Sequence, residues 1–164
     1  DGLSIRQYTE MDWAAVCRID DAARVQELAA GEVGPRAFRT MSEAAEDDEF
    51  FVSETVVACL HDSPVGFASW NGAYLSWLNV APGVQRRGIG WRLLQHALRQ
   101  MGPEAWTNML AQNGPALALY LRAGFEVVWT RPGDCDGYPC EAMRLALPTT
   151  RMRNPDAQRE PPTA

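Results

Sequence analysis

The segment from residue 73 to residue 101 changes its hydrophobic period midway, and this change constrains the fold more than any other feature. Residues 73–80 favour a β-strand, since they are rich in aromatic and aliphatic residues. Residues 88–101 instead repeat their apolar side chains at helical spacing, at Leu93, Leu94, Ala97, Leu98 and Met101. A strand that leads through a tight loop into an amphipathic helix is typical of α/β domains.

The other elements predict an α/β fold with a mixed central β-sheet flanked by helices, in the order βααβββαβαββ. We expect strands at residues 3–8, 50–60, 65–70, 73–80, 105–110, 125–130 and 140–147, and helices at residues 12–31, 34–45, 88–101 and 113–123. Asn71-Gly72 predicts a two-residue hairpin turn, and residues 131–138 are expected to form a polar loop. Residues 1–147 are therefore interpreted as one domain, and residues 148–164 as a disordered tail because they are polar and aperiodic.

Charge excludes some partners and favours others. The 164 residues carry a net charge of −6, which argues against a general nucleic-acid binder. Residues 1–62 have a balance of −9 and residues 63–164 a balance of +3, so the first part is expected to face a cationic ligand and the second an anionic one. No apolar run approaches the roughly 20 residues of a membrane span, and no secretory signal is visible, so we expect a cytoplasmic protein.

The loop that joins the strand to the helix has the composition of a phosphate site. Residues 85–90 place successive backbone N–H groups at the start of the helix, and Gly88 and Gly90 have no Cβ to keep a ligand away. The helix dipole and Arg86 and Arg87 add positive charge. Neither a Walker loop nor the Gly-x-Gly-x-x-Gly dinucleotide fingerprint is present, and a pyrophosphate is the favoured ligand.

A second segment, residues 113–125, predicts a capped helix. Asn113 is a suitable N-cap, and Ala116 and Tyr120 follow it at spacings that place all three on one helix face. Taken alone, this segment is a helix whose tyrosine packs on the sheet. Its position after the phosphate loop is what suggests a role in binding.

Together the two segments resemble the GNAT superfamily of N-acetyltransferases. Gln85-x-x-Gly88-x-Gly90 is similar to the acyl-CoA pyrophosphate motif of that family, and Asn113-x-x-Ala116-x-x-x-Tyr120-x-x-x-Gly124-Phe125 is similar to its second CoA motif. Residues 51–54, 65–67 and 143–145 resemble its strands, so the likeness spans about residues 3–147. The resemblance implies a GNAT-type domain that moves an acetyl group from acetyl-CoA to a primary amine by direct attack.

The resemblance also implies roles for individual residues. In the family, the strand matching residues 73–80 carries a bulge and separates from the strand matching residues 105–110, and the pantetheine arm enters there. The implied cofactor contacts are Leu78, Asn79, Val80, Gln85, Arg86, Arg87, Gly88, Ile89, Gly90, Asn113, Ala116 and Tyr120. Tyr120 matches the tyrosine that protonates the departing CoA thiolate, and a backbone N–H near Val80 is placed to stabilise the oxyanion.

Other features leave alternatives open. Glu54, Asp62 and Glu141 are candidates for the general base, or are solvated surface carboxylates. Trp70, Trp77 and Trp106 line an acceptor pocket or belong to the core, and Cys135 and Cys140 are close enough in sequence for a local disulfide. The acceptor is a small amine, a peptide N-terminus or a lysine, and the protein is a monomer or a homodimer. A non-catalytic acyl-CoA-binding domain is the second reading of the fold. A nucleotide-binding module is the third reading, and against it the sequence has no lysine to bind a phosphate.

Overall fold

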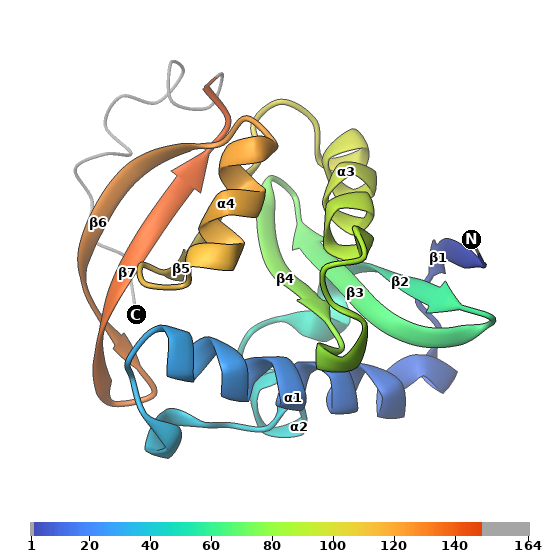
Figure 1. Cartoon of the computed structure of the whole chain (residues 1–164), viewed down its shortest axis with the longest axis horizontal. Helices are drawn as coiled ribbons and strands as arrows, with labels where there is room; N and C mark the ends of the chain where they lie inside the picture. The colour runs from blue at the N-terminus through green and yellow to red at the C-terminus, as the bar shows by residue number, and fades with distance from the viewer. Residues whose placement is uncertain (1, 149–164) are drawn as a thin grey trace.

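Seven strands form one mixed sheet in the order β1-β2-β3-β4-β5-β7-β6 (Figure 1). The computed structural model describes residues 2–148, so the predicted tail at residues 148–164 lies outside the described part except for its first residue. All neighbouring strands run antiparallel except β4 and β5, which are parallel. The strands are β1 (Leu3–Gln7), β2 (Glu54–Leu60), β3 (Ser63–Asn71), β4 (Tyr74–Val80), β5 (Trp106–Leu110), β6 (Glu126–Cys135) and β7 (Tyr138–Ala146). The predicted mixed α/β architecture is confirmed.

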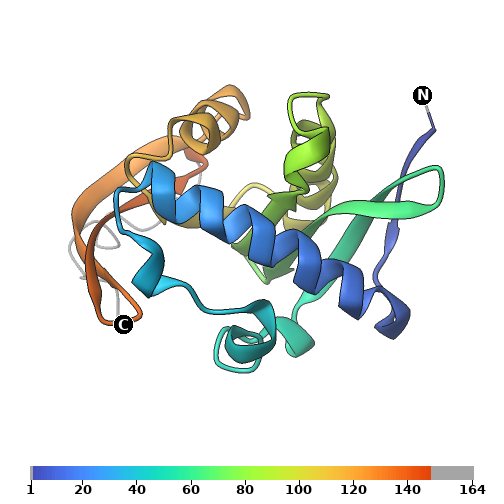
Figure 2. The ribbon, with the colours of Figure 1, turned by 60° about the horizontal axis from the view of Figure 1, so that its bottom comes forward.

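The helices cover both faces of the sheet (Figures 1 and 2). On one face lie α1 (Trp13–Ala30) and the short α2 (Met41–Ala44), packed on Val57, Cys59 and Phe67. On the other lie α3 (Ile89–Met101) and α4 (Gly114–Arg122), packed on the alternate side chains of the same strands, such as Val56 and Ala68. This alternation is the period of two that gives a sheet two faces. Among residues 2–148, none of the helices is long and apolar enough to cross a membrane.

The expected helix at residues 34–45 is wrong as a single element. The chain instead forms a 3₁₀ turn (Pro35–Ala37), an extended link and the four-residue α2. Phe38 packs into a cluster beneath β5 and β6, whereas Met41 is buried in the cluster beneath β2 and β3. One straight helix cannot serve both clusters, so packing overrides the weak helical pattern.

Two strand boundaries also differ from the prediction. Residues 50–52 form a 3₁₀ turn ahead of β2, because Phe50 turns inward against Tyr8, Trp13 and Trp77. The expected polar loop at residues 131–138 is wrong, since β6 and β7 continue through it and meet at a two-residue turn. Asp136 and Gly137 both have positive φ there, which is the conformation of a type I′ hairpin turn.

The sheet opens between β4 and β5. Their parallel ladder holds only at Tyr74–Trp106 and Leu75–Thr107. Ser76 is an extra residue opposite β3, since Ser69 pairs with Trp77 and Trp70 pairs with Leu75. This bulge bends β4 away from β5. We call the stretch where residues 76–80 and 108–110 are not paired with each other the notch, and it confirms the splayed strands implied by the sequence resemblance.

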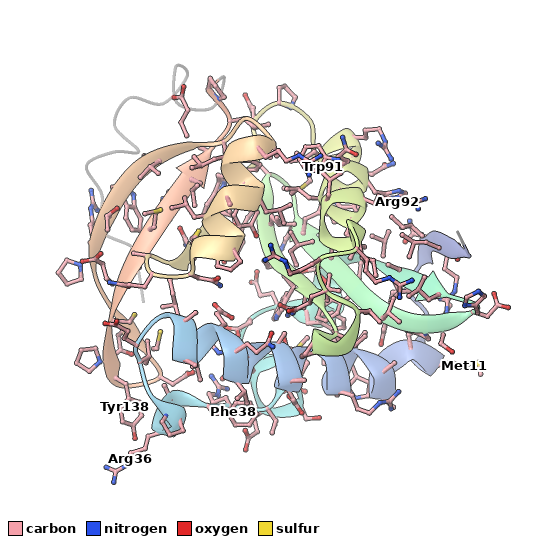
Figure 3. The ribbon with its side chains drawn as sticks, viewed as in Figure 1. Met11, Arg36, Phe38, Trp91, Arg92 and Tyr138 are labelled. Atoms are coloured by element: carbon pink, nitrogen blue, oxygen red, sulfur yellow. The ribbon has the colours of Figure 1, made fainter. Side chains whose placement is uncertain are left out.

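Helix α1 and the β6–β7 hairpin enclose the notch on one face of the sheet. Figure 2 shows α1 crossing the sheet from β1 toward the hairpin. At its far end, Leu28 shares a buried cluster with Leu110 and Cys135. The hairpin turn is tied to the chain before α2 by an ion pair of 3.1 Å between Arg39 and Asp136, and Figure 3 shows Phe38 and Tyr138 close together there.

Candidate functional site at the notch between two strands

The N-terminus of α3 lies directly after β4 and offers unsatisfied N–H groups. Its N-cap is Gly88, so no side chain caps the first turn. Gly88 has φ 78°, and Arg86 also has a left-handed φ of 63°, so this loop turns sharply into the helix. A Cβ on Gly88 would meet no atom within 4 Å, which leaves the side of the loop open to a ligand. These features fit a pyrophosphate cradled by backbone N–H groups.

Gln85 fixes this loop rather than extending from it. Its side-chain amide donates hydrogen bonds to the Val80 carbonyl oxygen at 3.1 Å and to Gln26 Oε1 of α1 at 3.0 Å. One glutamine thus ties the end of β4, the loop and α1 together. Arg86 and Arg87 are exposed beside it, and Ile89 is buried in the core, so only the backbone of Ile89 is available to a ligand.

The side chains of β4 divide between the two faces at the notch. Leu78 and Val80 pack on the α3 side of the sheet. Asn79 points to the opposite face, where its side-chain amide donates a 2.6 Å hydrogen bond to Asp20 of α1. The sequence reading placed Asn79 with the cofactor contacts, and the structure places its side chain on the α1 side.

Helix α4 lines the other side of the notch. Asn113 Oδ1 accepts a hydrogen bond from the Ala116 N–H at 3.4 Å, so the predicted N-cap is present. Gly90 of α3 lies where a Cβ would contact Leu119 of α4 and Val80 of β4, at 3.6 and 3.7 Å. Arg122 stacks over the Trp91 ring at 4.0 Å, and Figure 3 shows Trp91 at the side of α3 toward α4. The two helices therefore approach each other above the notch.

Tyr120 lies at the closed end of the notch. It is buried, 7% exposed, and its ring packs edge-on against Phe125 at 5.5 Å. Burial raises its pKa, while a hydrogen bond with Thr107 acts in the opposite direction. Thr107 forms the last β4–β5 rung and donates to the Leu75 carbonyl at 2.8 Å. Tyr120 is therefore a protonated hydroxyl held where the two strands separate.

The three carboxylates suggested as general bases lie outside β4 and β5, the two strands that border the notch. Glu54 begins β2 and pairs with Trp70, Asp62 lies in the β2–β3 turn, and Glu141 is on β7 opposite Pro132; all three are exposed. Asp20, which is 7% exposed, is a buried carboxylate that contacts β4 at the notch. A sequence signal existed, because Asp20 falls four residues after Val16 on the apolar stripe of α1.

Asp20 is the most electrostatically perturbed carboxylate of the site. Its pKa is raised to about 7, chiefly by burial and also by the negative charges of Glu27, Asp21 and Asp48, while the charge of Arg24 acts in the opposite direction. The charge of Glu27 also contributes to raising the pKa of Tyr120.

Of the tryptophans suggested for an acceptor pocket, Trp77 lies on the unpaired part of β4, and Trp70 and Trp106 lie outside it. Trp70 is core, Trp77 contacts Phe50, and Trp106 stacks on Tyr74 at 4.4 Å. A separate pocket of about 450 Å³ is lined by Tyr8, Glu10, Trp13, Phe50, Phe51, Ser53 and Thr55. Cys135 and Cys140 are free thiols with their sulfur atoms 3.1 Å apart. Within residues 2–148, no group of three or more His, Cys, Asp or Glu side chains could hold a metal ion.

Comparison with known proteins places this geometry in a family. The profile described as "Acetyltransferase (GNAT) domain" matches residues 46–127. This stretch includes the bulged strand, the α3 loop and α4, and the chain belongs to the GNAT family of acetyltransferases. Of the candidate cofactor contacts, all from Leu78 to Tyr120 fall inside it.

Individual relatives agree with this assignment. A peptidyl-lysine N-acetyltransferase, YjaB of Escherichia coli, is 38% identical over 85 residues, which are 52% of this chain and 57% of that protein. The chain thus matches little more than half of the relative's length. A GCN5-related N-acetyltransferase of Rhodopseudomonas palustris superposes with a TM-score of 0.71 at 20% identity, covering 90% of this chain and 97% of that one. YncA of Salmonella typhimurium, solved with its cofactor acetyl-CoA, superposes with a TM-score of 0.66 at 22% identity, covering 90% of this chain and 95% of that one.

Proposed function

We propose that the protein transfers the acetyl group of acetyl-CoA to a primary amine, with acetyl-CoA seated in the notch. The observation that carries this proposal is the free edge of β4 at residues 76–80. It lies next to the uncapped N-terminus of α3, and Tyr120 stands where the edge begins. An extended amide-containing chain pairs readily with an unpaired strand edge.

Each part of the notch suits one part of acetyl-CoA. The N–H groups at residues 85–90 would hold the pyrophosphate, with Arg86 and Arg87 adding positive charge. The free edge of β4 would pair with the pantetheine amides between Leu78 and Val80, and Asn113 and Ala116 would border it from α4. Acetyl-CoA supplies a thioester whose carbonyl carbon accepts the amine. Tyr120 would protonate the leaving thiolate, because its raised pKa keeps the hydroxyl intact at neutral pH.

The acceptor is proposed to be a lysine side chain of a peptide or protein. The relative YjaB is named a peptidyl-lysine N-acetyltransferase, which supports this class. On the α1 face of the notch, Asp20 and Glu27 present carboxylates, which suit a cationic amine. The charge of −9 over residues 1–62 acts in the same direction. A cytoplasmic protein acting as a monomer or homodimer remains the expectation.

The test is thiol release from acetyl-CoA with a panel of amines, together with mass spectrometry of the products. The panel contains a blocked peptide with one internal lysine, a lysine-free peptide with a free N-terminus, and a small diamine. The proposal predicts amine-dependent thiol release and acetylation of the lysine peptide above the other two. CoA binding without thiol release for any amine would instead identify a non-catalytic acyl-CoA-binding domain.

A pair of tyrosine variants controls this test. Tyr120→Phe removes the hydroxyl in the notch, and Tyr8→Phe removes a hydroxyl at the end of β1, outside it. Only the first is expected to slow thiol release. Equal slowing by both would indicate a general effect on folding and not a role of the notch.

A further inference from the structure

The strongest unexplained feature of the molecule is the buried pair of Asp20 and Asn79. Asp20 belongs to α1 and Asn79 to β4, yet the Asn79 Nδ2–Asp20 Oδ1 distance is 2.6 Å. The pair lies on the half of β4 that has left β5, so it borders the notch from the face opposite α3 and α4. A carboxylate that is 7% exposed is rare in a helix face that otherwise packs on a sheet.

We propose that Asp20 is the general base that removes a proton from the acceptor ammonium, and that Asn79 is the positioning residue that holds its carboxylate at the notch. This inference rests on the proposed function, because it assigns the base for that same reaction. It also replaces the three exposed carboxylates suggested by the sequence, Glu54, Asp62 and Glu141.

The geometry leaves Asp20 one oxygen for the substrate. Oδ1 accepts the Asn79 hydrogen bond, and within residues 2–148 the structure gives Oδ2 no hydrogen bond and does not seal it from solvent. A neutral amide donor fixes the position of the carboxylate and leaves its charge uncompensated. A salt-bridged arginine would compensate that charge. Arg6 compensates the charge of Asp12 in this way, with two hydrogen bonds of 2.8 Å that lower the Asp12 pKa.

The charges around Asp20 keep it basic. Asp21 and Glu27 on α1 and Asp48 after α2 are acidic, Arg24 on α1 is the basic group among them, and Asn79 on β4 is neutral. Arg24 is also paired with Glu27 at 3.2 Å, which weakens its hold on Asp20. A base whose pKa lies near neutrality accepts a proton and returns it to water at similar rates.

The proton count closes without another reactant. The acceptor arrives as R–NH₃⁺, and Asp20 takes one proton to leave R–NH₂. The amine nitrogen forms a bond to the thioester carbon and the carbon–sulfur bond breaks. Tyr120 gives its hydroxyl proton to the thiolate, which leaves as CoA–SH. The nitrogen loses its second proton to water, and Tyr120 regains a proton from water. Asp20 releases its proton to water, which restores the carboxylate.

Asp20→Asn tests this role, since asparagine keeps the shape and an acceptor for the Asn79 amide. We expect kcat/KM at neutral pH to fall about 100-fold with CoA affinity unchanged. The acidic limb of the parent pH–rate profile, near pH 7, should disappear. The loss of kcat/KM should shrink as the pH approaches the pKa of the acceptor amine, because the amine is then already deprotonated and needs no base. Asp62→Asn is the matched control, and it should behave as the parent does.

A readout that needs no turnover accompanies it. Carbon-13 NMR of the carboxyl groups should show one Asp resonance titrating near pH 7 that is absent from Asp20→Asn and present in Asp62→Asn. An Asp20→Asn variant that keeps the parent rate and acidic limb would overturn the proposal while leaving the acetyltransferase intact. If the parent itself shows no amine-dependent thiol release, the proposed function fails, and this assignment with it.

Discussion

Asn79 of β4 donates a 2.6 Å hydrogen bond to Asp20 of α1 across the face of the sheet. This contact joins the first helix to the strand that separates from its neighbour, so it couples two segments 59 residues apart at the notch. The Asp20 carboxylate of this pair is buried and has a raised pKa, so its ionisation costs free energy in the folded protein. Ionisable groups perturbed in this way are characteristic of functional sites.

The stability of the protein is expected to fall between pH 4 and pH 8 because of Asp20. Its pKa is raised in the folded state, so the folded protein holds this proton to higher pH than the unfolded chain does. The favourable contribution is complete below the unfolded pKa near 4 and is lost as the pH rises through about 7. A pKa shift of this size changes the free energy of unfolding by about 4 kcal/mol.

Asp20→Asn removes that ionisation and should therefore melt higher than the parent above pH 8 and about equally near pH 4. Melting curves across this range, by circular dichroism, measure the difference. A variant that is less stable than the parent above pH 8, where Asp20 is ionised, would mean that the charged carboxylate stabilises the fold, contrary to the structure.

Tyr120→Phe should reduce kcat by about 100-fold and leave CoA affinity nearly intact, since the ring and its packing on Phe125 remain. Because burial raises its pKa above that of free tyrosine, no limb from Tyr120 is expected below pH 10. Steady-state kinetics from pH 6 to 10 test both statements, and turnover at the parent rate would show that Tyr120 only packs.

Gly90→Val should weaken CoA binding at least ten-fold, or about 1.4 kcal/mol, because its side chain would enter the space between Val80 and Leu119. Gly90→Ala, whose Cβ makes ordinary contacts there, should have a smaller effect. Gly88 is less suitable, since its φ of 78° would strain any side chain and confuse binding with folding. Calorimetry with CoA gives the affinities, and wild-type affinity in a folded Gly90→Val protein would contradict the assignment.

Gly66→Ala should destabilise the protein by about 1–3 kcal/mol. An added Cβ would lie 2.9 Å from the Asn79 carbonyl oxygen and 3.1 Å from Leu93, so β3 could not approach β4 beneath α3. Gly114→Ala is the control, because nothing lies within 4 Å of its Cβ position. Chemical denaturation of both variants gives the comparison, and equal stability would show that the backbone relaxes freely there.

Local patterns predicted most of the architecture. The switch of period after residue 80 placed α3, and Asn113 placed the start of α4. The Asn71-Gly72 pair predicted the β3–β4 hairpin, but one residue early, because Asn71 pairs with Tyr74 and the turn residues are Gly72 and Ala73. The second hairpin was missed although Asp136-Gly137 is a strong turn signal. Pro132 beside it argued against a strand, but β6 is an edge strand, where proline is tolerated.

The site was predictable on the cofactor side and not on the acceptor side. The α3 loop and α4 are local motifs, whereas Asp20 reaches the notch only because α1 crosses the sheet. Its place in an apolar stripe was visible in the sequence, but its partner Asn79 was not. The carboxylates that the sequence suggested as bases, Glu54, Asp62 and Glu141, lie on or beside strands. Which of these side chains is exposed to solvent depends on the order of the strands in the sheet, which the sequence does not give.

Binding of acetyl-CoA in the notch is the property on which the proposed function depends most directly. Amide NMR spectra recorded while CoA is titrated into the intact protein report this residue by residue. Perturbations concentrated at residues 76–80, at residues 85–91 and around Asn113 and Tyr120 are the predicted result. Perturbations confined to the aromatic pocket of Tyr8 and Trp13, or no saturable change, would contradict the assignment of the notch.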